Sequence, residues 1–185
     1  ETNKAEAANY PFATIEPNVG RVSLSDKRLE LLSKIEKSQK VIPTYMDFVD
    51  IAGLVKGAAN GEGLGNKFLS HIREVDAIVH VVRCFEDKNI THIENKISPK
   101  DDIEIIQTEL KLADLEMLNK KKNNLEKKSK SGDKDIKEQL EIIRNLEKKI
   151  DNGESFNNIE FSEKNILFYK SLNLISSKPI LYVCN

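Results

Sequence analysis

Short apolar runs alternate with longer polar segments along this chain. Three of the runs, Met46–Val49, Ala77–Val82 and Ile180–Cys184, are rich in β-branched or aromatic residues and too short to be core helices. Such runs predict buried β-strands. Between them, Ser25–Lys40 and Gly65–Glu74 carry apolar residues at helical spacing among charged ones, which predicts amphipathic helices. The order of these segments predicts an α/β sheet.

Polar residues follow each predicted strand. The strands end at Asp50, at Arg83 and Cys84, and at Asn185. Open α/β sheets bind ligands outside the carboxyl ends of their strands. Asp50 is suited to a metal ion and Asn185 to a nucleotide base, so the pattern predicts a nucleotide-binding sheet.

Two long segments with helical periodicity follow the second strand. Ser98-Pro99 meets the rules for a helix start, and the periodicity continues until the polar segment Ser129–Lys134 interrupts it. The periodic positions are Ile103, Ile106, Leu110, Ala113 and Met117 before the break, and Ile136, Leu140, Ile143, Leu146 and Ile150 after it. Two helices joined by a tight turn predict an antiparallel coiled-coil hairpin inserted into the sheet domain. A further helix at Glu163–Leu174 is predicted to pack Ile166, Leu167, Tyr169 and Leu174 against the body.

Composition and charge narrow the function classes. Of the 185 residues, 39% are hydrophobic and 32% are charged, a balance that predicts a compact domain with an elongated, solvated element. The net charge of −1 implies no general attraction to DNA or to a membrane surface. There is also no apolar run of about 18 residues that would span a membrane. The segment Lys120–Lys149 is locally basic, with eleven Lys or Arg against six Asp or Glu. It is either a solvated coiled-coil exterior or a surface that contacts phosphates.

The cysteines and histidines indicate no zinc centre. Cys84 and Cys184 lie in apolar, strand-like runs, so we expect buried, reduced thiols in a cytoplasmic protein and no disulfide. His71, His80 and His92 lack the spacing of zinc ligands. We expect His80, inside a predicted strand, to be packed in the core.

The strongest candidate chemistry lies where the first predicted strand ends. Asp50 and Gly53 form a D-x-x-G pattern, and a glycine-rich, lysine-bearing loop follows. A carboxylate at a strand end holds the Mg²⁺ of a bound nucleotide, and a glycine lets a backbone N–H approach the terminal phosphate. The other candidate, Asn18–Arg21, fails the G-x-x-x-x-G-K-[ST] pattern of a phosphate-binding loop. We interpret it as a turn into a strand at Gly20–Leu24.

Four longer motifs make a family resemblance specific: NYPFATIEPNVGRV, FVDIAGLVKGAANGEGLGNKFL, REVDAIVHVVRCFED and DIEIIQTELKLADLE. On these motifs the chain resembles the YchF/Obg-like ATPase subfamily of the Obg-related P-loop NTPases, from about Lys4 to Asn185. The resemblance implies a P-loop NTPase-like (G domain) α/β sheet into which the coiled-coil hairpin is inserted. It also implies an ATPase that prefers ATP over GTP, a C-terminal TGS domain, and association with the ribosome, with the large subunit as the expected partner.

The resemblance assigns nucleotide-contacting roles to four residues. NYPFAT matches switch I, which makes Thr14 a ligand of Mg²⁺ and of the γ-phosphate. DIAG matches switch II, so Asp50 faces Mg²⁺ and Gly53 donates its N–H to the γ-phosphate. Asn185 matches the first residue of the base-reading motif, which is N-x-x-E in this subfamily and N-K-x-D in GTPases.

Two further positions bear on hydrolysis. Many related GTPases place a water-orienting glutamine directly after the switch II glycine, whereas Leu54 stands there in this chain, as it does in the subfamily. The family's loop histidine matches His92. That residue is a water-orienting candidate if its loop swings inward, and otherwise an ordinary polar loop residue.

The sequence departs from the family pattern at both ends. The phosphate loop with its lysine and Mg²⁺-binding Ser or Thr, the strand before it, the rest of the base-reading motif and the TGS domain are not found. We therefore expect an incomplete NTPase domain in residues 1–105 and 161–185, with the hairpin at 106–160, and no nucleotide binding by this chain alone. A GTP-preferring enzyme, and a ribosome- or RNA-binding module acting through the basic hairpin, remain open as alternatives.

Overall fold

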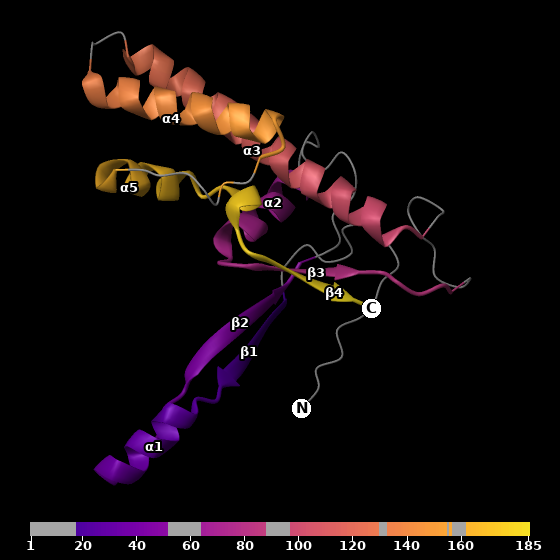
Figure 1. Cartoon of the computed structure of the whole chain (residues 1–185), viewed down its shortest axis with the longest axis vertical. Helices are drawn as coiled ribbons and strands as arrows, with labels where there is room; N and C mark the ends of the chain where they lie inside the picture. The colour runs from indigo at the N-terminus through magenta and orange to yellow at the C-terminus, as the bar shows by residue number, and fades with distance from the viewer. Residues whose placement is uncertain (1–17, 52–63, 88–96, 130–132, 155, 157–161) are drawn as a thin grey trace.

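The computed structural model describes residues 18–51, 64–87, 97–129, 133–154, 156 and 162–185. Strands and helices alternate in the first half of the chain, and two long helices then form an extended arm (Figure 1). The helices and strands predicted from the sequence pattern are present, with ends shifted by a few residues. In chain order they are β1 (Asn18–Leu24), α1 (Lys27–Glu36), β2 (Thr44–Asp50), α2 (Leu64–Glu74), β3 (Ile78–Val82), α3 (Pro99–Ser129), α4 (Lys134–Asp151), α5 (Glu163–Leu172), the 3₁₀ helix η3 (Ile175–Ser177) and β4 (Ile180–Cys184).

The described strands form two separate two-stranded sheets. β1 and β2 pair antiparallel over their whole length, from Asn18 opposite Asp50 to Leu24 opposite Thr44. β3 and β4 pair in parallel, as expected when helices form the connection between two strands. Asn18–Arg21, which we interpreted as a turn, already belongs to β1.

The prediction of buried strands is wrong for β2 and β4 and holds for only part of β3. Phe48 of β2 is 49% exposed, and Val81 of β3 and Leu181 of β4 are 62% and 63% exposed. The physical reason is coverage, since among the described elements no helix has extensive contact with the β1–β2 pair, while α3 contacts β3. Alternation places every second side chain of β3 on the open face, so Val82 is buried and Val81 is not.

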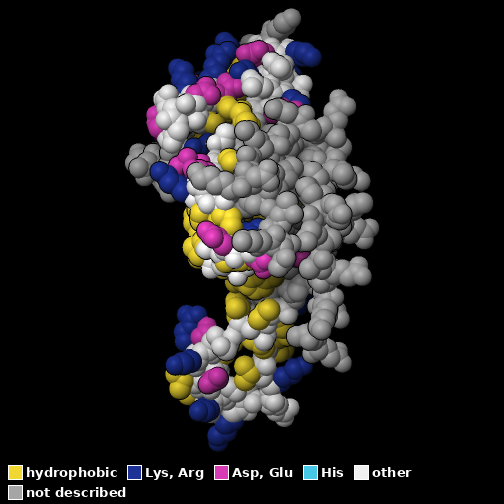
Figure 2. Space-filling view, turned by 90° about the vertical axis from the view of Figure 1, so that its right-hand side faces the viewer, with side chains coloured by type: hydrophobic (Ala, Val, Ile, Leu, Met, Phe, Trp, Pro, Cys, Tyr) yellow, Lys and Arg dark blue, Asp and Glu magenta, His cyan; other side chains and the backbone are white. Residues whose placement is uncertain are grey.

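The hairpin formed by β1, α1 and β2 projects away from the arm (Figure 1). α1 begins after Asp26, whose carboxylate accepts a hydrogen bond from the Arg28 N–H at 2.9 Å, a normal N-cap. Its predicted apolar face is present but uncovered, with Leu31 60% exposed. Figure 2 shows hydrophobic side chains at the surface of this lower part of the molecule.

The arm consists of α3 and α4, which lie side by side (Figure 1) and share one hydrophobic cluster. Periodic apolar residues of both helices meet there, and α5 and the segment after it close the cluster. Its buried members are Leu118, Leu125, Leu140, Ile142, Ile143, Leu146, Ile150, Phe156, Leu172 and Leu174. The predicted packing of this helical segment is confirmed for Tyr169 and Leu174, which join the cluster, and is wrong for Ile166 and Leu167, which are exposed.

A second hydrophobic cluster joins the arm to the rest of the molecule. Phe68, Leu69 and Ile72 of α2 are buried there, as their helical spacing predicts, against Leu110 and Ala113 of α3 and against Ile175 of η3. We call residues 106–118 of α3 the base of the arm. This cluster fixes α2 against the base of the arm.

Cys84 and Cys184 are free, as predicted, but both are exposed and not buried as we expected. Each lies at or beyond the end of a strand in the two-stranded β3–β4 sheet. Among the described helices, none combines the length and apolarity needed to cross a membrane.

Candidate functional site

Asp50 is the last residue of β2 and is exposed. Its backbone lies opposite Asn18 at the end of the β1–β2 ladder. The carboxylate therefore stands at the carboxyl end of a strand, as predicted, although β2 and β3 are not paired in the part of the chain that is described.

The residue after Asp50 anchors the chain to the second hydrophobic cluster. Ile51 is half-buried and packs against this cluster, whose buried members include Phe68 and Leu69 of α2. The chain thus leaves this cluster at Ile51 and returns to it on α2. The end of β2 and the helix that follows the D-x-x-G loop are consequently held by the same apolar contacts.

Asn185 continues the parallel β3–β4 pairing beyond the end of β4. Its N–H donates to the Val82 carbonyl at 2.9 Å, and its carbonyl accepts from the Cys84 N–H at 2.7 Å. These two bonds hold the backbone of Asn185 beside the end of β3. Asp50 and Asn185 therefore lie at the ends of strands in two different sheets.

The other predicted site residues lie outside the described residues. These are Thr14, Gly53, Leu54 and His92. Their roles as metal ligand, phosphate contact and water-orienting groups stay predictions.

A buried carboxylate that the sequence analysis missed lies at the base of the arm. The side chain of Asp114 is fully buried and accepts four hydrogen bonds from donors on α2 and η3. The donors are Arg73 Nη1 at 2.9 Å, Ile175 N at 3.1 Å, Ser176 N at 2.8 Å and Ser176 Oγ at 2.7 Å. Buried charges persist in folded proteins when they are paired and hydrogen-bonded in this way.

The end of α2 is held by a second set of bonds around Arg73. Its guanidinium also donates to the carbonyls of Ala113 at 3.2 Å and Asn173 at 3.0 Å. The Arg73 carbonyl accepts from Asn173 Nδ2 at 2.6 Å and from Lys178 Nζ at 2.5 Å. Lys178 Nζ also donates to the Val75 carbonyl. A cation and an amide thus satisfy a carbonyl of the last turn of α2, where no intrahelical donor is available.

Burial affects the titration of two groups beside this junction. Burial lowers the pKa of Lys178, and the nearby carboxylate of Asp76 acts in the opposite direction. Burial also lowers the pKa of His80, against the weaker opposing effect of Asp102.

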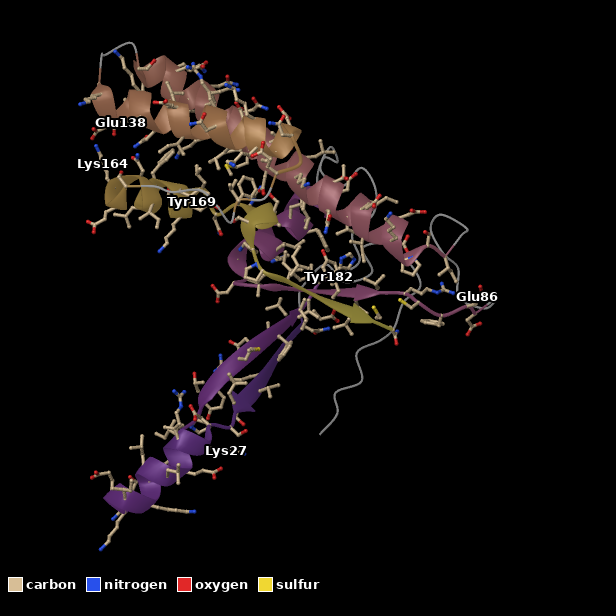
Figure 3. All side chains as sticks on the ribbon, viewed as in Figure 1. Lys27, Glu86, Glu138, Lys164, Tyr169 and Tyr182 are labelled. Carbon is tan, nitrogen blue, oxygen red and sulfur yellow. The ribbon has the colours of Figure 1, made fainter. Side chains whose placement is uncertain are left out.

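His80 is half-buried and lies between the β3–β4 sheet and the arm. Its ring lies 5.6 Å from that of Tyr182 on β4. The Tyr182 hydroxyl accepts from Gln107 Nε2 of α3 at 2.6 Å, and Figure 3 shows Tyr182 between β4 and that helix. The prediction of a packed histidine holds only in part, because the side chain is partly and not fully buried.

One sequence signal points to the Asp114 cluster. Asp114 lies four residues after Leu110 and directly after Ala113, within the apolar stripe of α3. A carboxylate at a position that helical periodicity assigns to the core predicts a buried partner. The sequence does not show which residues supply it, because Arg73 and Ser176 are 41 and 62 residues away.

Comparison with known proteins covers nearly the whole chain. A family model described as "50S ribosome-binding GTPase" matches residues 1–121. The chain is 51% identical to "Ribosome-binding ATPase YchF" of Bacillus subtilis over 98% of this chain and 50% of that protein. It is 50% identical to the protein of the same name from Haemophilus ducreyi, over 97% of this chain and 50% of that protein.

A solved structure, "Structure of the Schizosaccharomyces pombe YchF GTPase", matches with a TM-score of 0.71 and 37% sequence identity. The match covers 96% of this chain and 49% of that chain, so this chain spans about half the length of the relatives it matches. The α/β fold of P-loop GTPases is thereby shown. The chain belongs to the YchF/Obg-like subfamily of the Obg-related P-loop NTPases, within the family of 50S ribosome-binding GTPases.

Proposed function

We propose that this chain is part of a ribosome-associated NTPase that hydrolyses ATP, and that Asp50 faces the metal ion of the bound nucleotide. The observation that carries this proposal is the 51% identity, over 98% of the chain, to a protein named as a ribosome-binding ATPase. The position of Asp50 at the carboxyl end of β2 supports it, since nucleotide sites of α/β sheets lie at such ends.

The residues of the chain fit Mg²⁺. Asp50 offers an exposed carboxylate, and Mg²⁺ in nucleotide sites takes one or two protein oxygen ligands together with phosphates and water. We propose the Thr14 hydroxyl as the second protein ligand. When bound, the ion neutralises charge on the phosphates.

Hydrolysis then depends on positioning. In this proposal the N–H of Gly53 donates to the γ-phosphate, and His92 orients the attacking water because Leu54 has no polar group to do so. Phosphoryl transfer needs little covalent help from the protein, so alignment of water and phosphate supplies most of the catalysis.

An Asp50→Ala variant of the longer protein to which we assign this chain tests the metal ligand. We expect Mg²⁺-dependent ATP turnover to fall to background. Asp47→Ala is the matched control, because Asp47 lies on the same strand and its exposed carboxylate bonds only to Arg21 among the described contacts. Turnover like that of the wild type in Asp50→Ala would refute the metal assignment.

Nucleotide choice forms a separate part of the proposal. Asn185 aligns with the base-reading position, and we propose ATP as the preferred nucleotide. The printed names of the relatives differ, "ATPase" for the Bacillus protein and "GTPase" for the Schizosaccharomyces structure. Turnover of ATP and GTP by the longer protein under identical conditions decides between them, and a higher kcat/KM for GTP would reverse this assignment.

We further propose that the 185-residue chain alone does not bind ATP. Its sequence contains no G-x-x-x-x-G-K-[ST] motif, whose N–H groups and lysine hold the α-, β- and γ-phosphates. Titration calorimetry of the chain with MgATP is expected to show no heat of binding. Micromolar affinity would contradict this expectation.

We propose that the arm is a coiled-coil insertion whose placement responds to the nucleotide. The proposed boundaries are 1–105, 106–160 and 161–185, and the first of them falls inside the continuous helix α3, which starts at Pro99. The packing of α3 on α4 and on α2 supports the proposed arm. We also propose a cytoplasmic location, because a partner on the ribosome requires it.

A second candidate function is contact with ribosomal RNA or protein through the basic residues of the arm. Figure 2 shows Lys and Arg at this end of the molecule, interspersed with acidic side chains. Several of the cations already bond to carboxylates: Lys120 to Glu116, Lys122 to Glu147 and Arg144 to Glu126. This pairing reduces the positive electrostatic potential of the arm. We therefore rank contact with ribosomal RNA or protein second.

Lys121 and Lys127 are the sharper test of RNA contact because both are exposed. Lys122 is unsuitable, since its half-buried bond to Glu147 joins α3 to α4. We expect Lys121→Gln with Lys127→Gln to weaken ribosome co-sedimentation and its salt dependence. The matched control, Lys27→Gln with Lys34→Gln on α1, should leave both unchanged. Equal loss in both double variants would exclude the arm as the specific contact.

A further inference from the structure

The Asp114 cluster joins three parts of the chain that have different places in the proposed cycle. Arg73 belongs to α2, the helix that follows the switch II loop. Asp114 belongs to the base of the arm, and Ser176 belongs to η3, which leads into β4 and Asn185. One fully buried carboxylate of the arm therefore contacts both α2 and the 3₁₀ helix η3 that precedes β4.

Directional hydrogen bonds hold the carboxyl end of α2. Arg73 donates to Asp114, Ala113 and Asn173, and its carbonyl accepts from Lys178. The apolar residues Phe68, Leu69 and Ile72 add contacts along the helix. Its amino end continues from the loop that carries Gly53. A displacement that begins at the switch II loop therefore acts on α2, whose carboxyl end is bonded to the base of the arm.

The bonds at this carboxyl end are directional and hard to exchange. A neutral apolar contact tolerates sliding, whereas a buried carboxylate with four donors loses hydrogen bonds as soon as one partner moves. Leaving such a group partly unpaired is strongly unfavourable. The carboxyl end of α2, the base of the arm and η3 are accordingly expected to move as one unit.

We propose that Arg73 and Asp114 are positioning residues that transmit the nucleotide state of switch II from α2 to the orientation of the arm. This inference rests on the proposed function, because it needs a nucleotide that moves switch II. It goes beyond that function by naming the junction through which the arm is regulated. Movement of switch loops with the γ-phosphate is a general property of such NTPases, and the Asp114 cluster is the rigid element that carries it outward.

The test is a distance measurement in the longer protein. Spin labels are placed on Lys27→Cys of α1 and Lys137→Cys of α4, with Cys84→Ser and Cys184→Ser removing the two native thiols of this part of the protein. Pulsed electron paramagnetic resonance then compares the distance distribution with a non-hydrolysable ATP analogue and Mg²⁺ against that with ADP. We expect the two nucleotides to give different distributions in the otherwise wild-type protein.

Variants of the Asp114 cluster show whether it transmits the nucleotide state to the arm or only stabilises the fold. We expect Asp114→Asn to bind the analogue but to lose at least half of the distance shift. Glu116→Gln is the matched control, because it removes one negative charge from the same helix at an exposed ion pair, and it should keep the full shift. A purely structural role would lower the melting temperature of Asp114→Asn and leave the shift intact, and that result would overturn the proposal.

A milder variant keeps the test valid if Asp114→Asn does not fold. Asn173 has a positive φ of 48°, which glycine adopts without strain. Asn173→Gly therefore removes only the bond from Asn173 Nδ2 to the Arg73 carbonyl. We expect it to reduce the shift by less than Asp114→Asn, and an undiminished shift in Asn173→Gly would count against transmission through this junction.

Binding of a fluorescent ATP analogue, measured separately, distinguishes failure of the proposed function from failure of the proposed coupling. Absence of binding by the longer protein would overturn the proposed function and the coupling with it. Binding without any nucleotide-dependent distance change would overturn the coupling and leave the proposed function in place.

Discussion

The described part of the chain contains two carboxylate–arginine pairs with similar nitrogen–oxygen distances and opposite surroundings. In the β1–β2 hairpin, Arg21 donates to both oxygens of Asp47 at 2.7 and 2.9 Å, and both side chains are exposed. At the base of the arm, Arg73 donates to Asp114 at 2.9 Å, and Asp114 has no exposed side-chain area. Distance alone would rank these pairs as equals, but solvent screening weakens the first and three further donors support the second.

The same contrast holds for the apolar residues of the two regions. Leu118, Ile143 and Leu146 in the arm are buried almost completely, whereas Val22 and Phe48 in the hairpin are about half exposed. Both regions have regular backbone hydrogen bonding. In this molecule, regular secondary structure and tertiary stabilisation are therefore separate properties.

The largest expected difference in stability is between removing the buried carboxylate of Asp114 and removing the exposed carboxylate of Asp47. Asp114→Ala leaves buried N–H groups and the Arg73 guanidinium without an acceptor, which we expect to cost about 3–5 kcal/mol of unfolding free energy. Asp47→Ala removes an exposed pair and should lie within error of the wild type. Urea denaturation followed by far-UV circular dichroism measures both. Equal losses of unfolding free energy would show that burial does not make the Asp114 pair more important for stability than the Asp47 pair.

Truncating one apolar side chain in each region is expected to have the next largest effect. Leu118 is fully buried, and Leu118→Ala should destabilise the chain by about 3 kcal/mol through lost contacts and the cavity left behind. Val22 is 50% exposed, so Val22→Ala should cost no more than about 0.5 kcal/mol. The same denaturation assay applies. A large loss of stability from Val22→Ala would mean that the β1–β2 pair is covered in solution.

Gly153 and Gly20 differ in how well their backbone positions tolerate an added Cβ. Gly153, just after α4, has φ of +71°, and its N–H donates to the Ile150 carbonyl. Gly153→Ala should cost about 1 kcal/mol because a Cβ disfavours this conformation. Gly20 lies in β1, where an added Cβ would meet the Phe48 carbonyl at an ordinary 4.0 Å. Gly20→Ala should therefore be close to neutral in urea denaturation, and a loss equal to that of Gly153→Ala would contradict the backbone argument.

The smallest expected effect is a pH dependence of the chain's stability that arises from His80. Burial lowers the pKa of His80 in the folded chain, so between the folded and unfolded pKa values the unfolded state binds more protons. Stability should consequently rise as pH increases through this window below about 6.5. The urea midpoint measured from mildly acidic to neutral pH should show a slope that is reduced in His80→Phe. An unchanged slope in this variant would assign the dependence to other groups.

The sequence pattern located helices and strands well and their burial poorly. Helix α4 was predicted from Ile136 to Ile150 and runs from Lys134 to Asp151, because side-chain periodicity follows directly from helix geometry. Met46–Val49 was predicted as a buried strand and is an exposed one, since burial requires a covering element elsewhere in the chain. For the candidate site, the strand end at Asp50 was predicted correctly. The D-x-x-G pattern at Asp50 and Gly53 is too short to establish a metal site by itself, so the metal-binding and catalytic roles rest on the family resemblance.

By itself, the sequence determined the local elements, the family and the position of Asp50 at a strand end. Spacing of side chains, caps and short motifs are local properties, and they persist whatever the rest of the chain does. Only the tertiary structure decided which apolar faces are covered and that Asp114 meets Arg73, Ile175 and Ser176. Those contacts join residues 41 to 62 positions apart, and they form because burying Asp114 is favourable only when every donor arrives together.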